Sequence, residues 1–349
     1  MITVKEIAQI CHVSPSTVSN ILNGRANVGE KTRQRVLEVV KETGYQSNFF
    51  AQSMRKQSNR MIGIIVEELN QFSTSPIVAA IMANCEDHGY RTLLMNLRMH
   101  DKWNSSQFGD EEKLREILNP SIQEALSIRT DGLIYVAGHC RRIDCFPDNL
   151  PIPGVLAYGL SKNEKYPSVI IDDERGGYEI TRYLVGKGHK RIGIICGVEN
   201  NVHTQTRLVG YQKALYEAGL LYNPMWVRFG DWGRLSGYEE AKVLLDGGVT
   251  AIFCMNDIMA AGAYDCIRER GLVVGKDISV AGYDNREIAD FLFPRLTTNE
   301  IRLYEIGRMA AEIMMQQLED KQNSDRYSGV MRIPCRMIER ESVCILEEN

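Results

Sequence analysis

The chain has 349 residues, of which 44% are hydrophobic; this excludes a marginal mini-protein and predicts two or three domains with full cores. Its net charge of -4 is unevenly spread, because residues 1–60 hold nine Lys and Arg against four Asp and Glu, a balance of +5 that leaves -9 for the remainder. A basic N-terminal segment suits the phosphates of nucleic acid, and the acidic remainder limits non-specific binding.

Nine cysteines are scattered along the chain, and none forms a C-x-x-C pair. No signal peptide is recognisable, and no apolar run approaches about 18 residues. We therefore expect a soluble cytoplasmic protein with reduced thiols and no membrane partner. His139, Cys140 and Cys145 form a small cluster that admits a metal site, but no second pair stands at ligand spacing, so we expect neither a metal nor another cofactor.

The first helix of the chain is predicted by a capping box. Thr3 can accept a hydrogen bond from the amide of Glu6, whose carboxylate returns to the Thr3 amide, so the helix starts near Val4. The apolar positions that follow repeat at helical spacing, which commits one face of the helix to a small core. These positions are Val4, Ile7, Ala8 and Cys11.

The second helix, expected over residues 15–22, has an unusual composition. Ser14 is a good N-cap, and Pro15 fits the first helical position because its missing N–H costs nothing there. Short polar side chains crowd the exposed side, although such residues are poor helix formers. One interpretation is a capped, solvated surface helix. Its place as the second helix of a two-helix unit favours the recognition helix of a helix-turn-helix, with those side chains facing bases and phosphates. They are Ser14, Ser16, Thr17, Ser19, Asn20 and Asn23.

A third helix is predicted over residues 30–43, with Gly44 as its stop. The pattern then weakens, because residues 46–58 contain few charges and only scattered apolar residues. We predict a hinge there, helical only when another segment packs against it. The chain is thus expected to contain a DNA-binding domain over 1–45, the hinge over 46–58, and a larger core over 59–349.

From residue 60 onward, apolar strands alternate with amphipathic helices. Strands that are apolar throughout argue for parallel sheets covered on both faces. More than eight strands are too many for one comfortable sheet, so we expect two sheets and an α/β core. The predicted strands cover 61–68, 90–96, 131–138, 154–160, 168–173, 191–197, 226–230, 251–256 and 277–284.

Polar and aromatic residues stand at the ends of several predicted strands, where open parallel sheets bind their ligands. Tyr158, Trp232, Asn256 and Asp284 are four of them. Such a set suits a sugar, because the C–H face of a sugar stacks on an aromatic ring while its hydroxyls hydrogen-bond to carboxylates and amides. Each could instead be a helix N-cap or a core residue, and Asp257 in particular could cap the helix that follows it.

No nucleotide-binding or catalytic pattern is found in the sequence. The chain lacks G-x-G-x-x-G after a first strand, and it lacks G-x-x-x-x-G-K-[ST]. Asp231, Asp257 and Asp284 could in principle include an acid/base pair of the glycosidase kind. A sugar-binding cleft needs carboxylates as well, and no nucleophile–base signature surrounds a Ser or a Cys, so we do not expect an enzyme or catalytic residues.

Three segments carry a resemblance to a known family: TVKEIAQICHVSPSTVSNILNG, GEKTRQRVLEVVKETGY and NFFAQSMR. Together they resemble the head of the lactose-repressor and galactose-repressor (LacI/GalR) family of bacterial transcription regulators, and the likeness continues more loosely over the rest of the chain. The resemblance implies a two-lobed core of the periplasmic-binding-protein type, built from Rossmann-like sheets, with chain crossings near residues 160, 290 and 322. The first lobe would hold about 60–160 and 291–321, and the second about 161–290 and 322–343.

The resemblance also implies roles in DNA binding. Positions that face bases in the major groove are matched by Pro15, Ser16 and Asn20. Positions that mostly hold phosphates are matched by Thr17, Ser19 and Asn23. At residue 20 the family more often carries arginine or histidine, and because an amide pairs best with adenine, we expect a different preferred base there.

Tyr45 and Asn48 lead into the hinge. Met54 stands where the family usually has the leucine that wedges into the minor groove at the operator centre, and an apolar methionine can still wedge between base steps. An ordinary contact with the core is the alternative. We expect Met54→Ala to lose operator affinity in a gel-shift titration and to keep effector binding.

In the core, the resemblance implies an effector site. Arg207 occupies the position of the clamping arginine, Trp232 that of the stacking aromatic, and Asn256 and Asp284 those of two hydroxyl-reading residues. His203 falls where the family varies to suit its ligand. Tyr158 stands where many members carry Asp, which indicates a second stacking surface. The other jaw of the cleft would be formed in the first lobe by Phe72, Ser73 and Ser75.

The sequence therefore predicts a homodimeric, sequence-specific DNA-binding regulator, a repressor of carbohydrate-utilisation genes that binds a pseudo-palindromic operator. A small sugar between the lobes would change their relative angle and release the operator through a coupling of about 1–3 kcal/mol. Control by a phosphocarrier-type protein or by a purine stays open as an alternative. A solute-binding or transport protein is disfavoured by the basic head.

Overall fold

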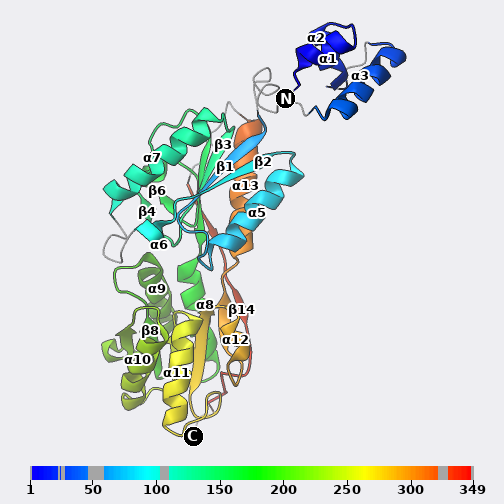
Figure 1. Cartoon of the computed structure of the whole chain (residues 1–349). Helices are drawn as coiled ribbons and strands as arrows, with labels where there is room; N and C mark the ends of the chain where they lie inside the picture. The colour runs from blue at the N-terminus through cyan, green and yellow to red at the C-terminus, as the bar shows by residue number, and fades with distance from the viewer. Residues whose placement is uncertain are drawn as a thin grey trace. The chain divides into compact units, whose positions relative to one another are not determined.

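The computed structural model describes residues 2–22, 24, 28–45, 59–102, 110–320 and 329–346. Contacts divide the chain into two compact units, Met1–Asn59 and Arg60–Asn349, which we call the head and the core. In Figure 1 the head is a small helical unit in blue, and the core consists of sheets covered by helices. None of the described helices combines the length and the apolar character that crossing a membrane requires.

In its described residues the head consists of three helices, α1 (Val4–Ile10), α2 (Pro15–Leu22) and α3 (Glu30–Thr43). The predicted capping box is present at the start of α1, and α3 ends at Gly44, which is in the left-handed conformation. The Ser14 hydroxyl accepts the amide of Thr17 at 3.1 Å and so caps α2, as predicted. The buried side chains form one small apolar core: Ile7, Ala8, Cys11, Val18, Ile21 and Val36.

The strands of the core are β1 (Met61–Val66), β2 (Arg91–Asn96), β3 (Gly132–Val136), β4 (Arg142–Ile143), β5 (Gly154–Ala157), β6 (Leu160–Ser161), β7 (Ser168–Ile171), β8 (Ile192–Cys196), β9 (Val227–Phe229), β10 (Ala251–Cys254), β11 (Ser279–Asp284), β12 (Thr297–Glu300), β13 (Val330–Ile333) and β14 (Arg336–Ile338). Within the described residues they form two six-stranded sheets, in the orders β13-β7-β5-β3-β1-β2 and β14-β12-β11-β10-β8-β9, and a pair β4-β6. The two large sheets are parallel except for β14, which runs antiparallel to β12. The predicted α/β architecture with two parallel sheets is confirmed.

Helices cover both faces of the first sheet. Ile62 and Ile64 of β1 belong to the cluster that includes α5 and α13, whereas Ile65 belongs to the cluster under α7, as the alternation of a strand requires. On the second sheet, α8 packs on α9 and α10 packs on α11. The helices of the core are α5 (Thr74–Asp87), α6 (Met99–Lys102), α7 (Glu111–Ser127), α8 (Asp173–Gly186), α9 (Val202–Glu217), α10 (Arg234–Asp246), α11 (Asp257–Glu269), α12 (Ile288–Phe291) and α13 (Leu303–Glu319), with 3-10 helices η2 (Lys162–Glu164) and η3 (Pro224–Trp226).

The chain passes between the two lobes three times, but each crossing comes later than predicted. Strand β7 still belongs to the first sheet, so the first crossing lies at Asp172 and not near residue 160. Strand β12 belongs to the second sheet and α13 packs on the first, which moves the second crossing from residue 290 to Ile301. The third lies at Pro334, between β13 and β14, and not near residue 322.

The predicted lobe boundaries, 60–160 with 291–321 and 161–290 with 322–343, are therefore too early. All nine predicted strands are present, but the short strands near the crossings were not predicted. In β12 the residues Thr297, Thr298 and Asn299 are fully buried although they are polar. Such a strand has no apolar signal, because its burial is supported by hydrogen bonds that only the folded chain provides.

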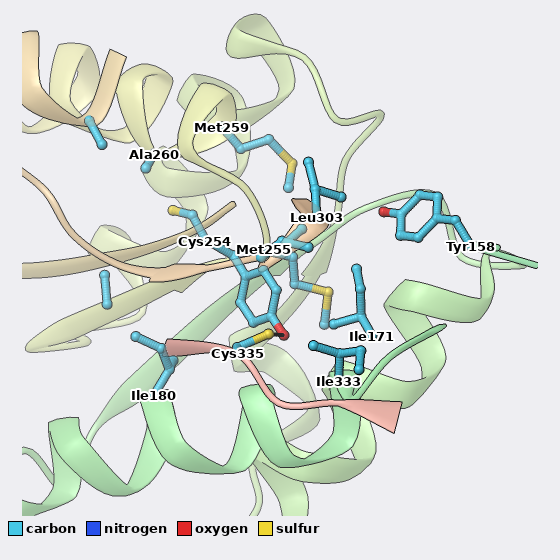
Figure 2. Close-up of a cluster of buried hydrophobic side chains, with 14 of the residues drawn as sticks. Tyr158, Ile171, Ile180, Cys254, Met255, Met259, Ala260, Leu303, Ile333 and Cys335 are labelled. Carbon is cyan, nitrogen blue, oxygen red and sulfur yellow. Dashed lines mark hydrogen bonds between the residues drawn. The ribbon is translucent and has the colours of Figure 1, made fainter. Parts of the chain in front are cut away.

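An apolar cluster joins the two lobes. Ile171 and Ile333 are the last residues of β7 and β13 in the first sheet. Met255 directly follows β10 in the second sheet. All three are buried, and Figure 2 shows their side chains pointing toward one another. The lobes thus meet through packed side chains beside the predicted effector residues.

Candidate functional sites

The predicted DNA-binding side chains on α2 lie on its outer side. Val18 and Ile21 are buried on the opposite side and hold the helix in place. Among the predicted residues, Ser14, Pro15, Ser16 and Asn20 are exposed, and Thr17 and Ser19 are half-buried.

Three hydroxyls at the start of α2 are linked to one another. The Oγ of Ser14 lies 2.6 Å from the Oγ of Ser16 and 2.8 Å from the Oγ1 of Thr17. The side-chain amide of Asn20 has no hydrogen-bond partner among the described residues. The surface of α2 therefore presents a row of hydroxyls held by mutual hydrogen bonds, followed by an amide that can donate to and accept from a base edge.

Of the remaining predicted DNA-binding residues, one is described in the structure and three are not. Tyr45 is half-buried and packs against the apolar core of the head, so its ring supports the head itself. Asn23, Asn48 and Met54 lie outside the described residues, as does the predicted hinge, 46–58.

In the core, the guanidinium of Arg207 on α9 is the centre of a buried cluster. Its Nε donates to Oδ1 of Asp173 at 2.7 Å, and its Nη1 donates to the carbonyl oxygen of Met255 at 2.5 Å. Nη1 also lies 3.9 Å from Oδ1 of Asp284. The guanidinium carbon is 3.7 Å from the ring centroid of Tyr283 and 6.0 Å from that of Trp232. We call Tyr158, Asp173, His203, Arg207, Trp232, Tyr283 and Asp284 the inner cluster.

His203 connects the inner cluster to the first lobe. Its Nδ1 lies 2.6 Å from Oδ2 of Asp173, and its Nε2 lies 3.2 Å from the backbone nitrogen of Cys140. A backbone N–H can only donate, so Nε2 accepts and the proton of the ring sits on Nδ1; these partners define a neutral imidazole. The ring centroid of Tyr158 lies 5.4 Å from that of His203.

Asp173 was missed in the sequence as a site residue. The only signal for it in the sequence is the pair Asp172–Asp173, two carboxylates at the end of a predicted strand. Asp172 is the N-cap of α8, and Asp173 is 4% exposed and faces Arg207 and His203. Burial by itself would raise the pKa of Asp173, but the charge of Arg207 and the hydrogen bond from His203 lower it below its ordinary value.

Two glycines bring Asp173 and Arg207 together. A Cβ on Gly177 of α8 would lie 2.3 Å from the carbonyl oxygen of Arg207, and a Cβ on Gly210 of α9 would lie 2.1 Å from that of Glu174. Neither distance is possible for a residue with a side chain. The two helices therefore approach to backbone contact, which places the start of α8 against the middle of α9.

The backbone is strained at three predicted effector residues. Tyr158, Trp232 and Asp284 have φ values of +60°, +71° and +101°, and Asn285 follows at +55°. Bulky side chains rarely adopt this region, which costs about 1–3 kcal/mol per residue and is found most often at ligand clamps. The strain aims the rings of Tyr158 and Trp232, and the ring of Trp232 lies directly on Gly197, where a Cβ would come within 2.0 Å of it.

Asn256, and not Asp257, caps the following helix. The alternative that Asp257 is the cap does not hold, because Asn256 is the N-cap of α11 and accepts the amide of Met259 at 2.7 Å. Its Nδ2 donates to the carbonyl oxygen of Trp232 at 3.0 Å. Asp257 is fully buried and accepts the Thr298 hydroxyl at 2.6 Å. Asn256 thus positions Trp232.

Burial dominates the protonation of two carboxyls at this edge of the second sheet. It raises the pKa of Asp284 to about 8, although Arg207 acts in the opposite direction. It raises the pKa of Asp257 to about 7 against the hydrogen bond from Thr298. At neutral pH the Asp284 carboxyl therefore carries a proton and can both donate and accept hydrogen bonds.

The first-lobe residues of the predicted site lie apart from Arg207. Phe72 stacks on Arg286, with the guanidinium carbon 4.7 Å from the ring centroid, and both line a cavity of about 420 Å³ that Asp284 also lines. The Ser75 hydroxyl donates to the carbonyl oxygen of Leu69 at 2.9 Å, and that of Ser73 donates to Gly138 at 3.0 Å. These two hydroxyls therefore hold the loop before α5.

Comparison with known proteins gives two family matches. The sequence model of bacterial regulatory proteins of the lacI family matches residues 3–48, and that of the periplasmic binding protein-like domain matches residues 181–343. The HTH-type transcriptional repressor PurR of Haemophilus influenzae (strain ATCC 51907 / DSM 11121 / KW20 / Rd) is 33% identical over 350 residues, which cover 98% of this chain and 99% of that protein.

Two further likenesses extend over the full length. The ribose operon repressor of the same strain is 29% identical over 351 residues, covering 100% of this chain and 98% of that protein. Among solved structures, the Lac repressor dimer bound to operator and the anti-inducer ONPF superimposes with a TM-score of 0.78 and 26% identity, over 98% of this chain and 99% of that chain.

Proposed function

Because the chain belongs to the lacI family of bacterial regulatory proteins, we propose that a small sugar, bound between the lobes of its core, controls its hold on operator DNA. The chain is a DNA-binding transcriptional repressor and not an enzyme, and its partners are operator DNA and a small-molecule effector. The finer points, namely the sugar, the residues that read it and the homodimer, are the proposal.

One observation supports a sugar as the effector. The inner cluster combines an indole and a phenol, both aimed by strained backbone, with the buried guanidinium of Arg207 and the carboxyl of Asp284. An aromatic face beside groups that both donate and accept hydrogen bonds suits the apolar C–H face and the hydroxyls of a sugar. The likeness to a ribose operon repressor supports the same choice.

A purine is the second candidate, and the 33% identity to the repressor PurR keeps it in view. A flat heterocycle is held best between two aromatic faces. Phe72, the aromatic side chain of the first-lobe loop, stacks on Arg286 and thus has one face already engaged. This arrangement favours the sugar.

On the DNA side, we assign base reading to Ser16 and Asn20 and phosphate contacts to Thr17 and Ser19. A homodimer would present two copies of α2 to the half-sites of a pseudo-palindromic operator. Met54 in the hinge keeps its proposed role as the wedge in the minor groove. An effector that favours lobes at a different angle would separate the hinges and release the operator.

The test begins with duplexes selected from a random DNA pool by the full-length protein. Asn20→Ala should weaken binding to the selected duplex by about 1–3 kcal/mol and relax the choice of base at one position of each half-site. Gln34→Ala, an exposed amide on α3, is the matched control and should bind as the unmodified protein does. Equal base preferences before and after Asn20→Ala would remove Asn20 from the reading residues.

The effector is tested by thermal shift, because a ligand that binds the folded state raises its midpoint. D-Ribose, cellobiose and hypoxanthine are the probes, and each is also added to the protein–DNA complex in a gel shift. We expect a sugar both to raise the midpoint and to change operator binding. If hypoxanthine does both and neither sugar does, the purine replaces the sugar as the effector.

A further inference from the structure

The inner cluster contains one cation, and its charge is already balanced. Arg207 is the only Lys or Arg of the cluster, and Asp173 binds its Nε at 2.7 Å with both side chains almost fully buried. His203 accepts a backbone N–H and is neutral. Asp284, 3.9 Å from the guanidinium, is a second carboxyl in the same space.

We propose that this site accepts an uncharged ligand and rejects phosphorylated or carboxylated ones, and that Asp173 is the residue that imposes the selection. The inference deepens the proposed function and rests on it. An anionic ligand would have to approach Arg207 while the ionised carboxylate of Asp173 already binds the guanidinium, and a like-charge contact in a buried site carries a large penalty.

Two neighbouring cations already have contacts of their own. Arg141 is bound to the buried Glu67 at 2.7 Å, and Arg286 lies against the ring of Phe72. Asp173 also lines a cavity of about 1000 Å³ beside α8 and α9, where four cationic and four acidic side chains stand around the wall. That cavity therefore offers no net attraction to a phosphate or a carboxylate.

The remaining polar groups suit hydroxyls. Tyr158 is 3% exposed, and its hydroxyl has no hydrogen-bond partner among the described residues. Figure 2 shows its ring pointing inward from the edge of the buried cluster. This hydroxyl can therefore exchange a hydrogen bond with a ligand hydroxyl. The Asp284 carboxyl, which is protonated at neutral pH, can serve a second one.

Isothermal titration of the full-length protein tests the selection. The probes are pairs that differ by one phosphate group: D-ribose with D-ribose 5-phosphate, D-glucose with D-glucose 6-phosphate, and inosine with inosine 5′-monophosphate. For the pair whose uncharged member binds, we expect the phosphorylated member to bind at least about 100-fold more weakly. This comparison needs no variant. A phosphorylated probe that binds as tightly as its uncharged parent, or more tightly, overturns the selection.

Asp173→Asn tests the assignment to Asp173, because the amide keeps the size of the side chain and removes its charge. We expect the preference for the uncharged member to fall at least about tenfold, since Arg207 is then free to meet a phosphate. Asp172→Asn is the matched control: asparagine is an equally good N-cap, so the preference should stay unchanged. An unchanged preference in Asp173→Asn overturns the role of Asp173.

The failures are distinguishable from those of the proposed function. Binding of D-ribose 5-phosphate without D-ribose would overturn the charge selection and leave a sugar-derived effector in place. Binding of inosine without D-ribose or D-glucose, and with rejection of inosine 5′-monophosphate, would overturn the free sugar as effector and uphold the charge selection.

Discussion

The head and the inner cluster of the core place their polar groups in opposite ways. The head has an apolar centre and carries the hydroxyls proposed to bind DNA on the outside of α2, where water can reach them. The inner cluster has its charges inside, where Asp173 and Arg207 must satisfy each other. The head can therefore change its surface residues at little cost to stability, whereas the core cannot lose one partner without stranding the other.

The comparison predicts its largest effect at Asp173. Asp173→Ala would leave the buried guanidinium of Arg207 without its counter-ion and should lower the free energy of unfolding of the core by about 3–5 kcal/mol. Urea unfolding followed by tryptophan fluorescence measures it. Glu174→Ala is the control: this residue lies next in the chain, in an exposed pair with Lys213 at 3.8 Å, and its loss should cost less than about 1 kcal/mol. A small loss in Asp173→Ala would show that water reaches Arg207.

In the head, the buried residue whose loss should cost most is apolar. Ile7 is fully buried in a core of six side chains, so Ile7→Ala should destabilise the head by about 2–4 kcal/mol and abolish operator binding while the core keeps its unfolding midpoint. Hydrogen exchange of the amides of α1 to α3 measures the change. Ile10→Ala, on the same helix but 48% exposed, should change the exchange by no more than about 0.5 kcal/mol. Equal effects of the two substitutions would contradict the packing described for the head.

A third prediction concerns pH. The pKa of Asp284 is about 8 in the folded core and 3.8 in its ordinary state, so the folded protein holds a proton that the unfolded chain releases between these values. The contribution of this carboxyl to stability is full below about pH 4 and is lost as the pH rises through 8. Asp284→Asn cannot ionise, and its stability relative to the unmodified protein should rise by roughly 2.7 kcal/mol from about pH 5 to pH 7. Parallel stability curves for the two proteins would contradict the buried, protonated carboxyl.

The smallest effect is expected at the surface of the head. Ser14→Ala removes the cap of α2 and should cost about 1 kcal/mol in the hydrogen-exchange measurement, because the Thr17 amide loses its side-chain acceptor and keeps only the Ser14 carbonyl oxygen. Ser16→Ala, exposed and without a capping bond, should be close to neutral in stability, although both should weaken operator binding. If the two substitutions destabilise α2 equally, the linked hydroxyls and not the cap alone hold the helix.

The same contrast explains what could be predicted from the sequence. The head was predictable because its determinants are local: the bond from Thr3 to Glu6 and the cap from Ser14 to Thr17 span three residues each. The apolar strands of the core were predictable for the same reason. Asp173 was not, because its partner Arg207 lies 34 residues further along the chain and meets it only after α8 and α9 have packed through Gly177.

Strand β12, which sets the second crossing, could not be predicted from the sequence for a related reason. Thr298 in β12 is buried because its hydroxyl donates to Asp257, and Asn299 is buried because its amide donates to the carbonyl oxygen of Gly176 on α8. Neither partner is near in sequence. Apolar periodicity detects burial that is driven by water exclusion, and it does not detect burial that depends on one specific distant partner.

The hydrogen bond between Cys140 and His203 has a consequence for how such a repressor could diversify. Its donor is a main-chain amide, so every residue at position 140 except proline supplies it, within the size allowed for a buried side chain. Its acceptor is the side chain at 203 alone. The contact between the lobes therefore tolerates substitution unequally: position 140 can vary among descendants with the contact intact, whereas most substitutions at position 203 remove it.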